Sequence, residues 1–159
     1  MNRAIPRKPL IDHVRDATPA DIEIIVAFNR SMAQETEGKQ LALEVLRPGV
    51  RTVVENPSVG RYFVACHGNE VVGQLMITTE WSDWRNGQIW WIQSVYVRPE
   101  HRRQGVFRAL YRHVEEVAHA TPGVVGLRLY VEHNNAVAQR TYESLGMRNA
   151  GYLVFEQVW

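Results

Sequence analysis

The sequence predicts a three-layer α/β domain built around a mixed, mainly antiparallel sheet. Three observations support this fold class: helical patterns come early, short alternating segments with tight turns fill the middle, and strand and helix patterns alternate near the C-terminus. A length of 159 residues fits one domain. We therefore expect an N-terminal tail over residues 1–11 and a single domain over residues 12–159.

The first element is a short strand in HVRD, followed by a helix. Thr18 is the predicted N-cap, Pro19 suits the first helical position and Asp21 lies in the first turn. The side of this helix that we expect to be buried carries Ile22, Ile25, Val26 and Met32. The stretch LEVLRPGVRTVVENP predicts a second helical region, interrupted near Pro48 and ended before Pro57.

Two hairpins are predicted next. RYFVACHGNEVVGQLMITTE alternates well enough for two strands joined by a tight turn at residues 67–69. EWSDWRNGQIWWIQSVYV contains Asn86-Gly87, a strong turn pair, before a long apolar strand.

A long helix is expected from Gly105 to about Pro122-Gly123 because apolar residues recur there at the spacing of one helix face. They are Phe107, Leu110, Tyr111, Val114, Val117 and Ala118. VVGLRLYV then predicts a strand, NAVAQRTYESLG a short helix closed by Gly146, and MRNAGYLVFEQVW a final pair of strands.

Composition excludes several classes of protein. A formal net charge of +1 does not suit a nucleic-acid-binding domain, and no apolar run is long enough to cross a membrane. Cys66 is the only cysteine, so no internal disulfide can form, and the N-terminus lacks the apolar core of a secretory signal. The six histidines are scattered without metal-ligand spacing. We expect a cytoplasmic protein without a metal.

The junction VRPEHRRQGVFRAL places four arginines and one glycine where a strand is followed by a helix. A helix N-terminus binds phosphate readily, and Gly105 allows close approach of the backbone. Arg102, Arg103 and Arg108 can add charge-assisted contacts. Taken alone, the pattern fits a phosphate site and a solvated basic helix start equally well.

This junction resembles motif A of the GNAT superfamily of acyl-CoA-dependent N-acyltransferases, with Arg102, Gly105 and Phe107 at its signature positions. The stretch LYVEHNNAVAQRTYESLGMRNAG is similar to the downstream motif B of the same superfamily. The matching residues there are Asn135, Ala138, Tyr142, Gly146 and Met147. The resemblance implies acetyl-CoA as cosubstrate and a sheet splayed in the middle, between strands ending near Val97 and Val131.

The resemblance also implies roles for individual residues. The edge at Val95 and Val97 would pair with the pantetheine arm, the Val95 N–H would face the thioester carbonyl, and Asn135 would touch the pantetheine or cysteamine end. The pyrophosphate would lie on the N–H groups of Arg103, Gln104, Gly105, Val106, Phe107 and Arg108, with Arg102 nearby. Phe107 departs from the family's small residue, and we expect its ring to turn into the core.

Acyl transfer to an amine needs a proton donor for the departing thiolate and an acceptor for the amine proton. Tyr142 is the predicted general acid. The strand Trp90-Trp91-Ile92-Gln93 lacks the Glu or His of many relatives, so the base remains open between a water chain and one of four carboxylates. These are Glu35, Glu37, Glu80 and Glu132.

The acceptor is expected to be an amine on a small molecule or peptide. QETEG places Glu35 and Glu37 where a cationic acceptor would be attracted. Trp81 and Trp84 belong to a tryptophan-rich segment with two interpretations: hairpin packing or a homodimer contact, and an aromatic wall of the acceptor pocket. The main functional alternative is a non-catalytic acyl-CoA or effector-binding module of the same fold.

Overall fold

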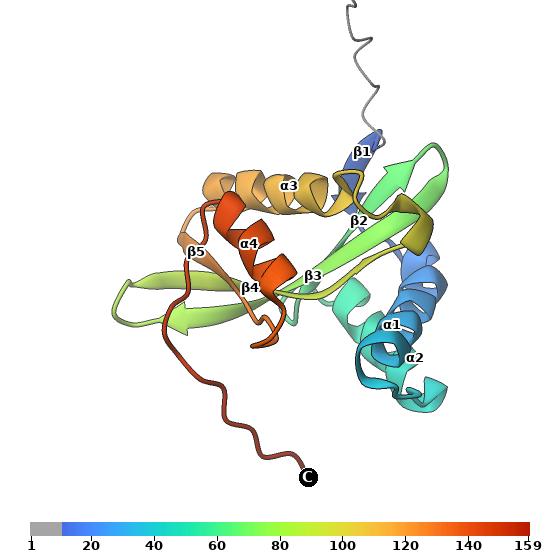
Figure 1. Ribbon diagram of the computed structural model, residues 1–159, viewed down its shortest axis with the longest axis horizontal. Helices are drawn as coiled ribbons and strands as arrows, with labels where there is room; N and C mark the ends of the chain where they lie inside the picture. Colours follow the sequence, from blue (N-terminus) through green and yellow to red (C-terminus); the bar gives the residue numbers. More distant parts are fainter. Residues whose placement is uncertain (1–10) are drawn as a thin grey trace, which may run out of the picture. The chain divides into compact units, whose positions relative to one another are not determined.

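The computed structural model describes residues 11–159 (Figure 1). Residues 11–129 form one compact unit and Tyr130–Trp159 a second one. Of the tail predicted over residues 1–11, all but Ile11 lies outside the described residues.

The first unit is built on a five-stranded sheet with the order β1-β2-β3-β4-β5. Its strands are β1 (His13–Asp16), β2 (Arg61–His67), β3 (Glu70–Ser82), β4 (Gly87–Val97) and β5 (Val124–Leu129). The first four strands pair antiparallel, and β5 pairs parallel to β4. The predicted mixed, mainly antiparallel sheet is confirmed.

Helices cover both faces of this sheet (Figure 1). Val64 of β2 packs in one core cluster with Ile25 of α1 (Ile22–Glu37) and Val50 of α2 (Leu43–Glu55). The ring of the neighbouring Phe63 lies 5.4 Å from that of His113 in α3 (Val106–Ala120). Because consecutive strand residues point to opposite faces, α1 and α2 lie on one side and α3 on the other. The predicted three layers are present in this unit.

The first helix begins a few residues later than predicted, at Ile22 with Asp21 as its N-cap. Thr18 is extended at the N-cap, and a 3₁₀ turn, η1 (Pro19–Asp21), leads directly into α1. Ile22, Ile25 and Val26 are buried as expected, whereas Met32 is only half-buried.

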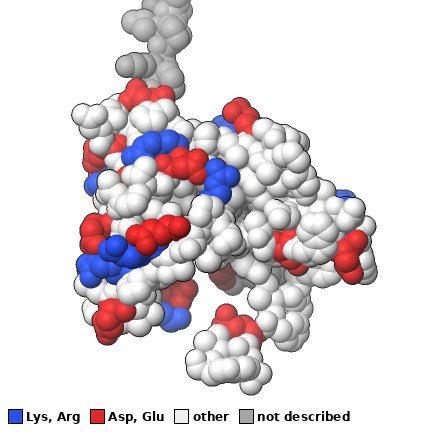
Figure 2. Space-filling model, turned by 180° about the vertical axis from the view of Figure 1, so that it is seen from behind, with Lys and Arg blue, Asp and Glu red and all other residues white. Residues whose placement is uncertain are grey.

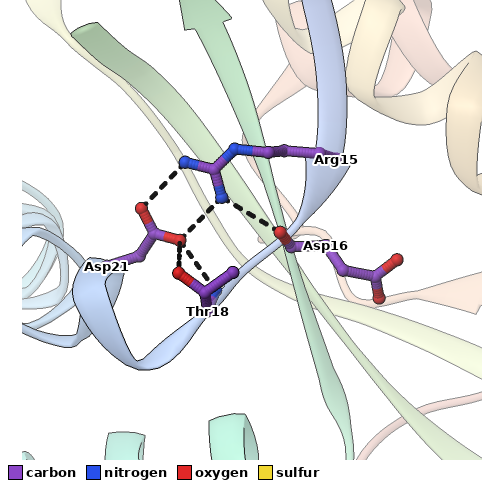
Figure 3. A network of polar contacts seen from close by, with 4 residues as sticks. All are labelled: Arg15, Asp16, Thr18 and Asp21. Carbon is purple, nitrogen blue, oxygen red and sulfur yellow. Dashed lines mark hydrogen bonds and ion pairs between the residues drawn. The ribbon is translucent and has the colours of Figure 1, made fainter. Parts of the chain in front are cut away.

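Hydrogen bonds between Asp21 and Arg15 connect this helix start to β1 (Figure 3). Its carboxylate accepts two hydrogen bonds from Arg15, at 2.7 and 3.0 Å, and one from the Thr18 N–H at 2.7 Å. The Asp21 side chain is only 7% exposed. Burial opposes its ionisation, but the hydrogen bonds from Arg15 and Thr18 outweigh burial and hold the pKa of Asp21 below its ordinary value of 3.8.

Replacing Asp21 with asparagine should lower the free energy of unfolding by about 1–3 kcal/mol at neutral pH, because charge-assisted bonds to a buried group are lost. A lowered folded-state pKa stabilises the fold above the unfolded value, and this contribution disappears as pH falls through the folded value. Urea denaturation of both proteins should therefore show their difference shrinking in acid. The control is Asp16→Asn, which removes the negative charge of an exposed carboxylate that pairs with Arg61. Equal losses in both variants would contradict this role for Asp21.

One prediction about α2 is wrong. The helix runs without a break through Pro48, where an interruption was expected. Proline removes one backbone donor, but the Pro48 carbonyl still accepts a bond from the Thr52 hydroxyl at 2.9 Å. Val50, two residues later, is buried in the core. Packing of this helix against the sheet outweighs the local cost of proline.

Both predicted hairpins are confirmed. Gly68 and Asn69 connect β2 to β3, with Gly68 at a φ of +59°. The turn between β3 and β4 includes Asn86 at a φ of +48°, which is the left-handed conformation that Asn tolerates best after Gly. Among the described residues, no helix is both long and apolar enough to cross a membrane.

The second unit contains the predicted short helix, α4 (Ala136–Ser144). Gly146 follows it at a φ of +94°, and the Met147 N–H returns to the Tyr142 carbonyl at 3.1 Å. The final pair of strands predicted in MRNAGYLVFEQVW is not formed: residues 147–159 carry no helix or strand. Alternating apolar residues favour a strand only when a neighbouring edge accepts their backbone hydrogen bonds, and this segment joins no ladder.

Candidate functional site

The sheet opens at the C-terminal end of β4. The β4–β5 ladder runs from Gln88 to Ile92 on β4 and ends at Leu129 of β5, whereas β4 continues to Val97. Within the described residues, the stretch 93–97 therefore has no strand beside it on the β5 side. Val95 and Val97, predicted to pair with a pantetheine arm, both lie on this open stretch.

A β-bulge occupies the middle of the same stretch. Gln74 of β3 is opposite Tyr96, and Met76 is opposite Gln93, so one residue of β3 faces two of β4. Ser94 has a φ of +49°, which is uncommon for a residue other than glycine. A bulge bends its strand and redirects the side chains and backbone groups around it. The backbone groups of Val95 therefore need not follow the alternation of a regular ladder.

The turn after β4 leads to a helix N-terminus. Gly105 is the N-cap of α3 at a φ of +82°, and Arg103 also takes a left-handed φ, +60°. The helical series begins with the bond from the Ala109 N–H to the Gly105 carbonyl at 2.9 Å. The first N–H groups of a helix point out of its end, and left-handed turn residues gather N–H groups into anion-binding hollows. A Cβ added at Gly105 would meet no atom within 4 Å, so the space beside this N-cap is open.

Arg102 is folded back onto β4 and α1. Its Nε donates to the Val97 carbonyl at 2.9 Å, and its Nη2 donates to Glu35 at 2.7 Å. Its guanidinium also lies over the Tyr96 ring, 5.4 Å from the centroid. Arg103, Gln104 and Arg108 are exposed around the helix start.

Phe107 differs from its expected place. Its side chain is half-buried, with the ring 6.2 Å from that of Tyr111, whereas Val106 takes the fully buried position at the helix start. The first apolar contact of α3 with the sheet is made by Val106, because a Cβ at Gly73 of β3 would stand only 2.9 Å from the Val106 side chain. The large ring therefore lies beside the core and not inside it.

The two acidic residues of QETEG lie at the C-terminal end of α1 and have different surroundings. Glu35 accepts hydrogen bonds from Arg102 and from the Tyr96 hydroxyl, the latter at 3.2 Å. Glu37 is exposed and pairs with Lys39. The structure thus brings Glu35, but not Glu37, into contact with the turn after β4.

The tryptophan-rich segment lies away from the bulge. Trp81 is opposite Gln88, seven residues before Val95 on β4, which corresponds to roughly 23 Å along a strand. Trp81 is 61% exposed and Trp84, in the hairpin turn, is 88% exposed. The structure does not bring these two side chains to the open stretch of β4.

In the second unit, Asn135 is the N-cap of α4, and its side-chain oxygen accepts a bond from the Ala138 N–H at 3.0 Å. Tyr142 lies two turns further along the same helix. Burial raises the pKa of Tyr142 above its ordinary value of 10.0, so the phenol stays protonated at neutral pH.

The remaining base candidates are engaged in hydrogen bonds. Glu80 accepts from the Trp91 indole at 2.8 Å and from Arg128 at 3.2 Å. Glu132 accepts from the Asn134 N–H at 3.1 Å. In the part of the chain that the structure describes, no three His, Cys, Asp or Glu side chains gather in a way that could hold a metal ion.

The sequence reasoning missed the polar residues around the bulge, above all Gln74 and Ser94. Gln74 stands in an otherwise apolar strand and is fully buried. A polar residue at a core position of a predicted strand was the available signal.

Comparison with known proteins agrees with this geometry. Residues 26–147 match the model of the acetyltransferase (GNAT) family. The chain is 27% identical over 132 residues to the thialysine N-epsilon-acetyltransferase of Caenorhabditis elegans, a match covering 83% of this chain and 80% of that protein.

Solved structures are also similar. A possible acetyltransferase from Clostridium difficile 630 is 43% identical, with a TM-score of 0.86 over 92% of this chain and 97% of that one. An integron cassette protein from the mobile metagenome of Cole Harbour Salt Marsh has a TM-score of 0.82 at 22% identity, over 98% of this chain and 95% of its own. The second likeness shows the shared fold.

Proposed function

The chain belongs to the acetyltransferase (GNAT) family, and on this premise we propose that it transfers an acetyl group from acetyl-CoA to a primary amine. The observation that carries the proposal is the junction of β4 and α3. There, an open strand edge with a bulge leads within a few residues to a glycine-capped helix N-terminus. An extended amide-bearing chain that ends in a pyrophosphate fits this combination.

The residues of the junction suit the parts of acetyl-CoA. The N–H groups from Arg103 to Arg108 would hold the pyrophosphate, helped by the arginine side chains. The backbone of Val95 and Val97 would pair with the amides of the pantetheine arm. Bound there, acetyl-CoA supplies an acetyl group activated as a thioester.

The chain's own groups would then serve the transfer. The Val95 N–H would donate a hydrogen bond to the carbonyl oxygen of the acetyl group, where negative charge develops as the amine attacks. The Tyr142 hydroxyl would give its proton to the departing sulfur, which its raised pKa permits by keeping it protonated. Asn135 would touch the pantetheine or the cysteamine end. We propose direct attack in a ternary complex, in which the proton of the attacking amine passes to a water chain or to one of the four candidate carboxylates.

We propose a cationic amine as the acceptor, on a small molecule or a peptide, and the cytoplasm as the location. Glu35 and Glu37 at the end of α1 offer negative charge for such an acceptor. Nucleic acid is not proposed as a partner: on the face drawn in Figure 2, basic and acidic side chains lie beside one another. Trp81 and Trp84, exposed on the hairpin, suit a contact between two copies of the chain better than an acceptor wall.

Glu35→Gln and Glu37→Gln should each raise the apparent KM for a cationic acceptor, because each removes one negative charge from its approach. We expect a several-fold effect for Glu35, which touches Tyr96 and Arg102, and a smaller one for the exposed Glu37. Steady-state kinetics with each substrate varied in turn checks this. An unchanged acceptor KM in both variants would exclude these carboxylates from the acceptor site.

A panel assay tests the proposed function. Purified protein is incubated with acetyl-CoA and one of several amines, namely small polyamines, amino acids, aminoglycosides and peptides, while free thiol is measured. Amine-dependent release of CoA is the expected result. Binding of CoA without transfer to any acceptor would favour the non-catalytic binding module instead.

A further inference from the structure

We propose that Gln74 is a positioning residue that holds the β4 bulge and thereby directs the Val95 N–H toward the open side of the strand. Gln74 lies in the middle of β3, and its side chain is fully buried. The consequence for catalysis rests on the proposed acetyl transfer. The structural role of Gln74 in fixing the bulge is independent of that proposal.

The Gln74 side chain contacts Ser94, the residue of the bulge with a positive φ. Its Nε2 donates to the backbone carbonyl of Ser94 at 3.1 Å and to the Asn29 side-chain oxygen at 2.8 Å. A residue other than glycine at a positive φ costs roughly 1–2 kcal/mol and persists only where its surroundings hold it. The hydrogen bond from Gln74 to the Ser94 carbonyl stabilises this conformation.

The same network anchors the bulge to α1 and β2. Asn29 of α1 is buried and donates from its Nδ2 to the Tyr62 hydroxyl of β2 at 3.1 Å. Burial raises the pKa of Tyr62, and hydrogen bonds with Asn29 and with the Ser94 side chain partly offset this. Ser94 is therefore held through both its carbonyl and its side chain.

Stability alone does not account for a glutamine at this position. The Oε1 of Gln74 is buried without a hydrogen-bond partner among the described residues, which is costly for a polar atom. Methionine has a similar length and would remove this unsatisfied acceptor, but it would take the Gln74 donor away from both the Asn29 oxygen and the Ser94 carbonyl. One unsatisfied acceptor is removed and two acceptors lose this donor, so we expect a modest loss of stability together with the loss of the bond to Ser94.

The test compares wild-type protein with Gln74→Met by two measurements. NMR of the ligand-free protein should show changed amide and Cα shifts at Ser94 and Val95, because the positive φ is no longer fixed. With the best amine of the panel, kcat should fall roughly 10- to 100-fold, up to the effect of losing one donor to a developing oxyanion. The Kd for CoA, which lacks the acetyl carbonyl, should stay within about threefold of the wild-type value, since the phosphate contacts remain.

Val64→Ala is the matched control. Val64 is directly opposite Gln74 in the β2–β3 ladder and fully buried, but it makes no hydrogen bond with Ser94 through its side chain. It should lower stability and leave the Ser94 shifts and kcat unchanged. If Gln74→Met does not fold, Gln74→Asn replaces it, since the shorter amide cannot reach both partners.

Unchanged shifts at Ser94 and Val95 in a folded Gln74 variant would overturn the proposal, and so would changed shifts with full kcat. A wild-type protein that binds no CoA would refute the proposed function instead. In that case the shifts alone would still decide whether Gln74 holds the bulge.

Discussion

Replacing Gly105 with glutamate is expected to abolish CoA binding, with a loss in affinity of at least 100-fold. Gly105 caps α3 at the point where the N–H groups of the helix start are exposed, and a carboxylate there would occupy the position that we propose for the phosphate and would repel it. An added Cβ at Gly105 would meet no atom within 4 Å, so the fold should survive. Its left-handed φ of +82° adds a strain of roughly 1–2 kcal/mol.

Gly123→Glu controls for that strain. Gly123 lies just beyond the other end of α3, has a φ of +84°, and likewise has no atom within 4 Å of an added Cβ. The two variants therefore share the backbone cost and the added charge, but only one lies at the helix N-terminus. We expect the two variants to have comparable melting temperatures. Only Gly105→Glu should lose CoA binding. Normal affinity in a folded Gly105→Glu protein would place the phosphates elsewhere.

Tyr142→Phe should lower kcat by roughly 100-fold while leaving folding and CoA affinity unchanged, because it removes only the hydroxyl that we propose as the proton donor. Burial raises the pKa of Tyr142 above 10.0. The donor form is therefore lost only as pH rises through that raised value, and wild-type kcat should show no decline from this group between pH 7 and about pH 9.

Tyr152→Phe is the control for this substitution, since Tyr152 belongs to the same unit and is 77% exposed. It should retain full kcat. Solvent-isotope effects or single-turnover rates must show that chemistry limits the rate in each protein. A Tyr142→Phe enzyme with full kcat under that condition would assign protonation of the sulfur to water or to another donor.

Local patterns in the sequence were sufficient for most of the fold. The turn at Asn86 and most of the apolar face of α3 depend on interactions between residues close in the chain, and both are confirmed, with Val106 and not Phe107 buried at the helix start. Thr18 caps the 3₁₀ turn that leads into α1. Pro48 shows the opposite case: the local rule predicts a break, but burial of residues such as Val50 against β2 keeps the helix continuous. The prediction of two C-terminal strands was wrong because a strand forms only beside the edge of another strand, and the local sequence does not show whether such an edge is near.

The candidate site was predictable only in part. Gly105 and the arginines follow one another in the chain, so their motif is visible in the sequence. The bulge depends on the register of two strands and on a buried bond between Gln74 and Ser94, twenty residues apart. The pairing of Glu35 with Arg102 joins residues separated by 67 positions. Such contacts exist only once the fold is formed.

Calorimetric titration of the purified protein with CoA tests the central claim, that the N-terminus of α3 and the open edge of β4 form a CoA site. CoA and acetyl-CoA should bind with comparable affinity, since both carry the pyrophosphate and the pantetheine arm. The affinity should weaken as salt is raised from 0.01 to 0.15 M, because screening of the phosphate contacts increases. Absence of detectable binding at low salt would contradict the account.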